Sequence, residues 1–414
     1  MPESINLKLK FNLYIFFLIF YSVFYLYVKH NVGNDSSISE WLINYQGGFT
    51  RRGLGGEINI LITKLTSLSL RKSIFLLQSS LHVFYLILVL IFFRNLKINI
   101  LQLFAIFTPI FLLYPIAEIE VLGRKEMVLF IFFIGTIFLA GTNYSHKILD
   151  KYIFYILPLV CLIWEEVVLY IPYILVILIF KNNLKTFKSL IYKSIIVFMP
   201  TIIIFIIIMI FPLSSSGHKE MCEYLLIQFG ERCYMSASLL VTNTIYFDTF
   251  DFVHKNASFI HYFRYLMIFL VGFFPLNYLV YKNSFKFTNN FINKNFQLKS
   301  IFLILYIPPI LLFLFGYDWG RWINITYTFS VLLYFYFLKN DLITNNFLIT
   351  KNFFNKFFFK KNSIIIIFII FSFGWNPKTV ITGDIGSFPI YRIIYNSSKI
   401  IFNFNSFRLF ENKI

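Results

Sequence analysis

Residues 152–180 read YIFYILPLVCLIWEEVVLYIPYILVILIF, and the way in which this stretch crosses a membrane decides the fold. The run has 29 residues, more than the roughly 20 that one helix needs to cross the hydrocarbon core of a bilayer. Trp164, Glu165 and Glu166 interrupt it near the middle. One interpretation is a single long helix, and the other is a hairpin of two short helices with both glutamates at its tip.

The composition places the chain among helical membrane proteins. Of its 414 residues, 58% are hydrophobic and 21% are aromatic, and apolar runs of bilayer length recur along the chain. The formal net charge is +18, but the lysines are scattered between the apolar runs, so anionic lipid headgroups explain this charge better than nucleic acid does. We therefore expect an all-α, polytopic membrane protein that forms a single integral membrane domain over residues 1–414.

Nine further apolar runs are expected to span the bilayer. The first of them is expected to remain as a span and not to be removed as a signal peptide. The runs are 11–28, 74–93, 101–116, 127–141, 190–212, 259–280, 301–316, 323–338 and 363–375.

The distribution of lysine and arginine decides between the two interpretations of 152–180. With a hairpin and a cytoplasmic N-terminus, the segments on the inside carry 18 Lys/Arg against three acids, whereas those on the outside carry 17 against 16. With a single helix, the basic stretches 282–299 and 351–361 would face outward, against the bias that sets orientation in membranes. The hairpin is favoured, and it predicts about eleven spans with a cytoplasmic N-terminus and a periplasmic C-terminus. The inside segments are 1–10, 94–100, 142–151, 181–189, 281–299 and 339–362.

Three sizeable segments then lie outside. Loop 29–73 has an amphipathic second half, 58–70, which either lies in the membrane interface or re-enters the membrane. Loop 213–258 contains Cys222 and Cys233, which form a disulfide in an oxidising compartment or remain two separate thiols. The C-terminal tail, 376–414, has an apolar stretch of its own at 391–402.

The unusual polar motifs of the chain all fall on this outer side. They are GGFTRRGLGGE (47–57), AEIEVLGRKE (117–126), WEE (164–166) and GYDWGRW (316–322). Ionisable groups at the membrane boundary are costly and are usually paired or functional. Together the motifs offer cations for an anionic ligand and carboxylates for base catalysis. Each motif also has a simpler explanation, such as lipid phosphate binding, pairing of the arginines with Glu57, or an Asp–Arg pair that stabilises a turn.

The glycines of the first motif favour an anion-binding loop. Gly47, Gly48, Gly53, Gly55 and Gly56 allow close backbone approach, and successive N–H groups of such a loop can hold phosphate oxygens. Arginine adds bidentate recognition of the same oxygens. The six histidines do not cluster in the sequence, so no metal site is predicted.

With paired arginines in an outer loop, GRKE after the third span, an acidic hairpin tip and a DWGRW turn, the chain resembles O-antigen polymerases of the Wzy type and, more broadly, GT-C glycosyltransferases. The resemblance implies glycosyl transfer from an undecaprenyl-diphosphate-linked oligosaccharide at the periplasmic face in surface polysaccharide synthesis, without a cofactor and with other assembly proteins as possible partners. It assigns the diphosphate to Arg51, Arg52, Arg124, Lys125 and Arg321. The catalytic base is expected to be Glu120 or Glu165, and after them Asp318.

Two other functions are compatible with the same motifs. A flippase or transporter for lipid-linked glycans would need polar residues along a path through the membrane, whereas the mid-span segments are mostly Ile, Leu and Phe. A GT-C enzyme that uses a polyprenyl-monophosphate sugar would need a divalent metal and an acid just after the first span. Asp35 is the nearest candidate for that acid, and metal dependence is not favoured.

Overall fold

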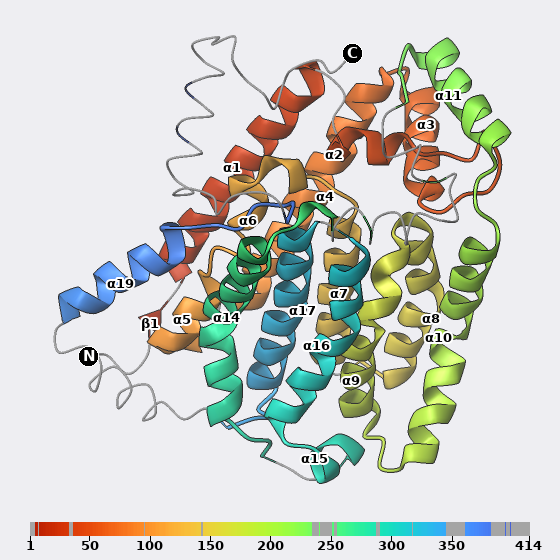
Figure 1. Cartoon of the computed structure of the whole chain (residues 1–414). Helices are drawn as coiled ribbons and strands as arrows, with labels where there is room; N and C mark the ends of the chain where they lie inside the picture. Colours follow the sequence, from red (N-terminus) through yellow and green to blue (C-terminus); the bar gives the residue numbers. More distant parts are fainter. Residues whose placement is uncertain are drawn as a thin grey trace.

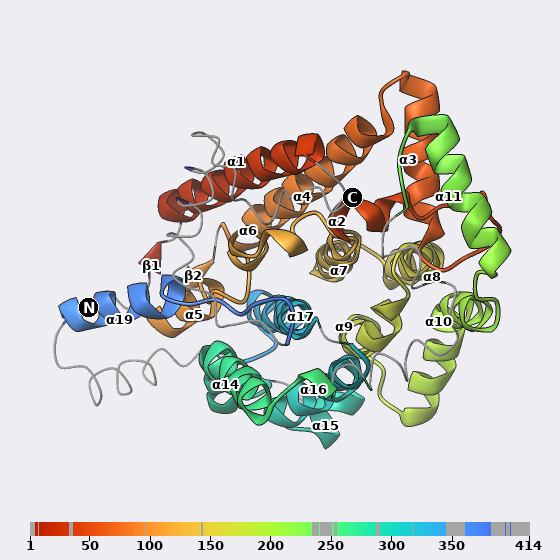
Figure 2. The same cartoon turned by 45° about the horizontal axis from the view of Figure 1, so that its top comes forward.

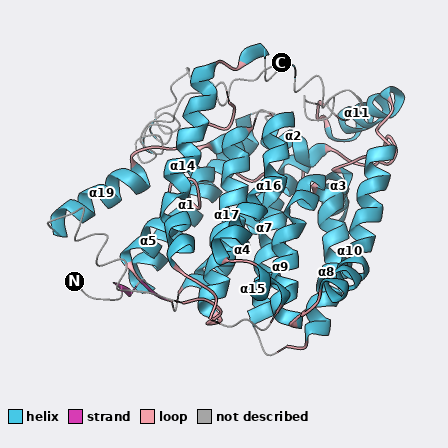
Figure 3. Ribbon diagram, turned by 60° about the horizontal axis from the view of Figure 1, so that its bottom comes forward, coloured by secondary structure: helices cyan, strands magenta, loops and turns pink. Residues whose placement is uncertain are grey.

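The structure is a computed structural model of the whole chain, in which almost all of the described residues are helical or in short connections (Figures 1 and 3). The structure describes residues 5–6, 8–32, 36–94, 96–141, 144–233, 255–286, 290–316, 318–344 and 361–381, together with residues 240, 251, 394 and 398.

These ranges contain sixteen α-helices, three short 3-10 helices and one pair of two-residue strands. In chain order they are β1 (Ile5–Asn6), α1 (Lys8–Val32), α2 (Ser36–Ser39), η1 (Glu40–Leu42), α3 (Gly53–Thr66), α4 (Leu70–Phe93), β2 (Lys97–Ile98), α5 (Ile100–Ile106), α6 (Tyr114–Ala117), η2 (Ile119–Val121), α7 (Glu126–Gly141), α8 (His146–Ile163), η3 (Glu165–Tyr170), α9 (Ile171–Asn182), α10 (Phe187–Ile210), α11 (Ser215–Phe229), α14 (Phe259–Lys282), α15 (Phe291–Asn295), α16 (Leu298–Phe315), α17 (Trp319–Lys339) and α19 (Lys361–Phe373).

Helix ends coincide with capping residues that border the apolar runs. The side chain of Ser69 accepts a hydrogen bond from the backbone of Lys72 at the start of α4. Thr186 and Ser189 form a reciprocal capping box at the start of α10. Such caps satisfy backbone N–H groups that have no partner within the helix, and they fix where each helix begins.

Among the described residues, four helices are long and apolar enough to cross a membrane, namely Leu9–His30, Leu70–Phe93, Phe187–Ile210 and Phe259–Lys282. Three shorter helices are also apolar, at Glu126–Gly141, Leu298–Leu314 and Ser363–Phe373. The architecture is thus all-α, with several helices of membrane-spanning character. The count of eleven spans is an interpretation that goes further than these helices.

The stretch 152–180 folds as two helices that meet at an acidic turn, as the hairpin interpretation predicted. Helix α8 ends at Ile163, the 3-10 helix η3 makes the turn, and α9 returns alongside α8. Glu165 and Glu166 stand at the start of η3.

Segments that the sequence places on one side of the membrane contact one another in the structure. At one end of the bundle, β1 pairs with β2, the connection after α14 bonds to the one after α17, and α15 bonds to the connection after α9. The contacts are Ile5 with Ile98, Lys286 N–H with Leu342 O at 3.0 Å, and Phe291 N–H with Leu184 O at 2.8 Å.

The connections at the other end of the bundle also meet. The last turns of α1 contact η2, the loop before α3 contacts η3, and α17 contacts the segment after α19. The contacts are Lys29 Nζ with Ile119 O at 2.6 Å, Arg52 with Glu165, and Gly320 N–H with Thr379 O at 3.0 Å. In Figure 1 this end, near α2, α3 and α11, lies at the top, and α15 lies at the bottom.

The prediction of a continuous span over 101–116 is wrong. Helix α5 ends at Ile106, turns follow through Leu113, and the one-turn helix α6 leads to η2. Pro109 and Pro115 lack the N–H groups that a continuous helix needs. The broken segment is almost entirely buried in protein, which is where non-helical backbone is tolerated at membrane depth.

Helix α17 lies at the centre of the bundle, with α7, α9, α14 and α16 around it (Figure 2). Every residue from Gly320 to Phe337 is buried. Its polar side chains bond to the carbonyl groups that the break after α5 leaves without helical partners. Asn324 Nδ2 donates to Ile110 O at 2.8 Å and to Phe111 O at 3.0 Å. Tyr327 Oη donates to Ala105 O at 2.7 Å.

The expectation that mid-span segments lack polar groups is therefore wrong for α17. Asn324, Thr326, Thr328 and Ser330 are buried along it. The hydroxyl groups of Thr328 and Ser330 donate to backbone carbonyls four residues earlier in the same helix. These polar groups stabilise the central packing.

Candidate functional site

A cluster of ten charged residues occupies one end of the bundle, and we call it the ion cluster. Its residues come from η1, the loop before α3, the start of α7 with the two residues before it, η3, and the start of α17. They are Glu40, Arg51, Arg52, Arg124, Lys125, Glu126, Glu165, Glu166, Asp318 and Arg321.

The segment 36–56 positions the first part of the ion cluster. Trp41 is buried and its indole N–H donates to Gly123 O at 2.8 Å, which ties η1 to the turn that carries Arg124 and Lys125. Gly56 lies so close to this segment that a Cβ atom there would stand 2.0 Å from Ile43 O. Only glycine allows α3 to pack at this distance.

Arg124 and Arg321 share carboxylates at the centre of the ion cluster. Arg124 Nη1 lies 3.1 Å from Glu40 Oε1 and 3.3 Å from Asp318 Oδ2. Arg321 Nη1 lies 3.1 Å from Asp318 Oδ2 and 3.6 Å from Glu40 Oε1, and its Nε bonds to Glu126. Asp318 exposes 19% of its side chain, whereas the other four side chains expose 7% or less and are nearly inaccessible to solvent.

Arg51 and Arg52 bind the acidic tip of the α8–α9 hairpin. Arg52 Nε donates to both oxygens of Glu165, at 3.0 and 2.9 Å, and Arg52 Nη2 lies 2.9 Å from Glu166 Oε1. Arg51 Nη1 lies 3.5 Å from Glu165 Oε1. These pairs differ from the alternative in which the arginines pair with Glu57.

Lys125 links the two halves of the ion cluster. Its Nζ donates to Arg52 O at 2.6 Å and lies 5.7 Å from the centre of the Trp41 ring. Arg52 itself has a left-handed backbone, with φ of 62°. The bond from Lys125 therefore supports a strained conformation that turns Arg52 towards η3.

The cluster is close to electrically neutral. Five cations face five carboxylates, and a further pair, Lys378 and Glu118, stands beside them at 3.6 Å. Buried charges of this kind are strongly destabilising when one partner is removed. An anionic ligand must therefore compete with carboxylates that already hold the arginines.

The environment separates the two glutamates of the tip. Burial would raise the pKa of Glu165, but Arg52 and then Arg51 lower this pKa below its ordinary value. Burial raises the pKa of Glu166, and its Oε2 atom is buried without a hydrogen-bond partner among the described residues. Glu165 is thus an ion-pair partner, and Glu166 is the better proton acceptor.

The lysine of the cluster is also perturbed. Burial lowers the pKa of Lys125 to about 7, against the weaker opposite effect of Glu40. Lys125 therefore changes charge near neutral pH, so the net charge of the cluster depends on pH in this range.

The core of the ion cluster holds polar atoms with unused bonding capacity. Glu40 Oε2, Glu126 Oε2 and Arg321 Nη2 are buried and have no partner among the described residues. Buried polar atoms without a partner are rare and costly. Water or a bound ligand would satisfy these three.

The structure brings together the predicted residues Arg51, Arg52, Arg124, Lys125, Glu165, Asp318 and Arg321. It separates Glu120 from them, because that side chain is exposed and only its backbone carbonyl contacts Arg124, at 2.7 Å. Asp35 lies outside the described residues.

Four of the five predicted loop glycines are closely packed against protein. A Cβ atom at any of these four would lie within 3.2 Å of another group, whereas Gly48, with φ of +107°, faces open space. The packed glycines are Gly47 against Gly217, Gly53 against Tyr45, Gly55 against Trp41, and Gly56 against Ile43. Their close contacts are made with protein, so Gly48 is the one that remains open to a ligand.

Glu40 is the main residue that the sequence interpretation missed. It lies between apolar residues in ISEWLI, and an acid in such a context indicates a buried, paired carboxylate. Lys378 was also missed, because its partner Glu118 is 260 positions away in the sequence.

The fold and the site together define an all-α protein with several potential membrane spans and an ion cluster at one end. Comparisons with protein-family models, with curated proteins and with solved structures found no match. The ion cluster is therefore the feature of this chain that bears most directly on its function.

Proposed function

We propose that the protein is a membrane glycosyltransferase of the polysaccharide polymerase type. It acts on polyprenyl-diphosphate-linked oligosaccharides, and the ion-cluster end faces the periplasm. The observation that carries the proposal is the ion cluster, in which Arg51 and Arg52 bind the two glutamates of the α8–α9 tip, and the pKa values of these glutamates shift in opposite directions.

The charge bias supports this orientation. The segments that meet at the opposite end of the bundle carry the excess of lysine and arginine that marks cytoplasmic loops. The ion cluster is then on the periplasmic side, where lipid-linked oligosaccharides are polymerised in the family that the chain resembles.

The arginines suit a diphosphate leaving group. Negative charge grows on the bridging oxygen as the glycosidic bond breaks, and preorganised donors stabilise that charge, with one donor contributing about 3–4 kcal/mol. Arg51 is the most accessible cation of the central set after Arg52, with 16% and 20% of their side chains exposed. A diphosphate that binds these two arginines takes the place of Glu165 and Glu166.

This displacement gives the carboxylates a role. When the diphosphate engages Arg52, Glu166 loses its cation, and its deprotonated form becomes a stronger base. Glu166 then accepts the proton of the acceptor hydroxyl, a step that contributes about 10²–10⁴-fold to the rate. We therefore propose Glu166 as the general base in preference to Glu120, Glu165 and Asp318.

Surface glycan in cells tests the proposal. Cells that lack the protein should accumulate single-unit glycan at the surface, whereas loss of a flippase would leave no surface glycan. Arg51→Ala and Glu166→Gln should each give the same loss of long chains at normal protein level. Lys219→Ala, an exposed cation in α11, is the matched control and should leave chain length unchanged. Unchanged long chains in both variants would overturn the proposal.

A further inference from the structure

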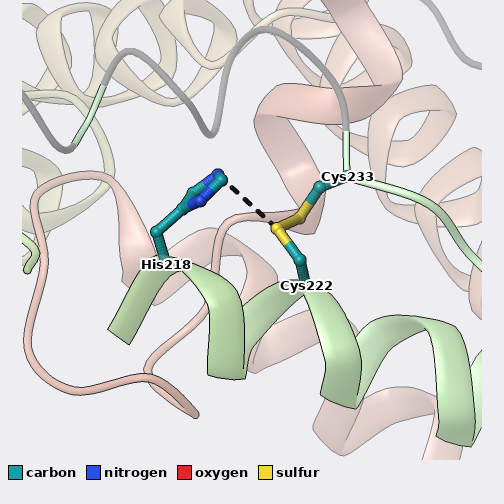
Figure 4. Close-up of side chains that lie close together, drawn as sticks. All are labelled: His218, Cys222 and Cys233. Carbon is teal, nitrogen blue, oxygen red and sulfur yellow. Dashed lines mark hydrogen bonds between the residues drawn. A yellow bond between two sulfur atoms is a disulfide. The ribbon is translucent and has the colours of Figure 1, made fainter. Parts of the chain in front are cut away.

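A second group of reactive side chains lies in α11 and in the turn after it, apart from the ion cluster. Cys222 and Cys233 form a disulfide, and His218 lies one helical turn before Cys222 on the same face of α11 (Figure 4). The Nε2 atom of His218 is 3.5 Å from Cys222 Sγ. One potential ligand atom from each of the three residues lies within 4.8 Å of the others.

We propose that reduction of this disulfide creates a binding site for a soft divalent metal ion such as Zn²⁺. The ligands are His218 Nε2, Cys222 Sγ and Cys233 Sγ, and the fourth position is open to water. The segment thus has two alternative covalent states, a disulfide without metal and a metal-bound dithiolate.

The three ligand atoms lie close to the arrangement that tetrahedral zinc requires. Zn–S and Zn–N bonds of about 2.3 and 2.0–2.1 Å place a sulfur and a nitrogen ligand about 3.6 Å apart. The present separation of His218 Nε2 and Cys222 Sγ, 3.5 Å, already matches this value. The two sulfur atoms must move apart to about 3.8 Å, and cleavage of their bond permits that movement. The ligand nitrogen of His218 and Cys233 Sγ, which lie within 4.8 Å of each other, must also settle at about 3.6 Å.

The backbone holds Cys233 in place without the disulfide. Gly230 ends α11 with φ of 67°, and its N–H and that of Glu231 bond to Leu226 O and Leu225 O at 3.0 and 3.1 Å. Glu231 also binds Arg71 of α4 through two bonds of 2.6 and 3.0 Å. The turn therefore stays beside α11 when the sulfur–sulfur bond is broken.

The chemistry of the site is balanced and selective. A dithiol reductant supplies two electrons and two protons to the sulfur–sulfur bond, and is itself oxidised to a disulfide. Metal binding then releases the two thiol protons. Two thiolates and one imidazole favour Zn²⁺ over Mg²⁺ or Ca²⁺, which prefer oxygen ligands. All three side chains are half-buried, so the site is accessible to ions.

Cobalt binding to the purified full-length chain tests the inference. The chain is reduced with a phosphine in detergent and titrated with Co²⁺, which gives thiolate charge-transfer absorption. We expect one Co²⁺ per chain, displacement by Zn²⁺, and no such absorption before reduction. His218→Ala should weaken binding by at least about tenfold, because loss of even an outer partner of a ligand costs 10–100-fold. His146→Ala, an exposed histidine at the opposite end, is the control and should bind as the unmodified chain does.

Thiol protection in native membranes gives a second readout that does not depend on purification. After reduction, Zn²⁺ should protect Cys222 and Cys233 from a maleimide reagent in the unmodified chain and fail to protect them in His218→Ala. The inference is wrong if the reduced, folded chain shows no thiolate absorption with Co²⁺. It is also wrong if His218→Ala binds Co²⁺ and is protected by Zn²⁺ as well as the unmodified chain.

Discussion

Replacement of Arg321 by methionine is the strongest perturbation that the ion cluster offers. The arginine side chain is only 3% exposed, bonds to Glu126, and lies within 3.1 and 3.6 Å of Asp318 and Glu40. Its loss leaves Glu126, itself 2% exposed, without its cation. Removing one partner of such a buried pair costs about 3–5 kcal/mol, so we expect Arg321→Met to lower the free energy of unfolding by this amount.

A double-variant cycle separates the ion pair from general damage to packing. Glu126→Gln keeps the shape of the side chain and removes its charge, so it should be mild alone, because Arg321 keeps Asp318 and Glu40. Combined with Arg321→Met, it should recover about 1.5–3 kcal/mol relative to the sum of the two single effects. Lys286→Met removes an exposed pair at the opposite end and should cost no more than about 1 kcal/mol.

Unfolding in mixed detergent micelles, followed by far-ultraviolet circular dichroism, measures these differences. The reasoning is refuted if Arg321→Met lies within 1 kcal/mol of the unmodified chain. Strict additivity in the cycle would also refute it, because the two side chains would then not interact. The same cycle explains why Arg321→Ala and Arg124→Ala are poor tests of activity: both leave buried carboxylates uncompensated and are expected to reduce the amount of folded protein.

Three further predictions follow from the packing and the pKa values. Burial lowers the pKa of Lys125 to about 7 from 10.5, so above pH 7 the unfolded chain binds a proton that the folded chain lacks. The free energy of unfolding should therefore rise with pH between about 7 and 10, by up to about 1.4 kcal/mol per pH unit. Unfolding of Lys125→Met, measured at pH 7, 8 and 9, should lack this rise. Gly56→Ala should lower the free energy of unfolding by about 1–3 kcal/mol, because its Cβ atom overlaps Ile43 O. In Gly141→Ala the Cβ atom would lie 3.4 Å from Asn340 Oδ1, so this control should unfold at the same detergent concentration as the unmodified chain. Equal stability of the two variants would contradict the close packing of Gly56. Asn324→Leu should cost about 1–3 kcal/mol, because it removes the side-chain donor of the buried Ile110 O, whereas Phe111 O keeps its bond from Tyr114 N–H at 3.3 Å. A stable variant in the same assay would show that the bonds from Asn324 do not hold the broken segment.

The sequence predicts the helical class and the arrangement of the connections well, because both depend on local patterns. Long apolar runs set where most helices lie, and several connections that the lysine bias assigns to the same side contact one another in the structure. The hairpin at 152–180 followed from the same bias. The break at 107–113 did not, because an apolar run with prolines is compatible with either a kinked helix or a buried loop. Tertiary burial around α17 decides between the two.

The site was predictable in its residue types but not in its pairing. Arg51, Arg52, Arg124 and Arg321 stand out against an apolar background, whereas their partners come from positions up to 281 residues away, as for Glu40 and Arg321. The distinction between Glu165 and Glu166 depends on which of them Arg52 holds with two bonds, and that is set by the left-handed backbone of Arg52. Local sequence carries no record of such contacts.

The measurement that tests the proposed function most directly is polymerisation by the purified chain in lipid bilayers. A polyprenyl-diphosphate-linked oligosaccharide is supplied as both donor and acceptor, and the glycan length and the released polyprenyl diphosphate are measured together. We expect a ladder of longer glycans with one diphosphate released per added unit, lost in Arg51→Ala and Glu166→Gln and retained in Lys219→Ala. A folded chain that neither extends the glycan nor releases diphosphate, or variants that extend it as the unmodified chain does, would contradict the proposed function.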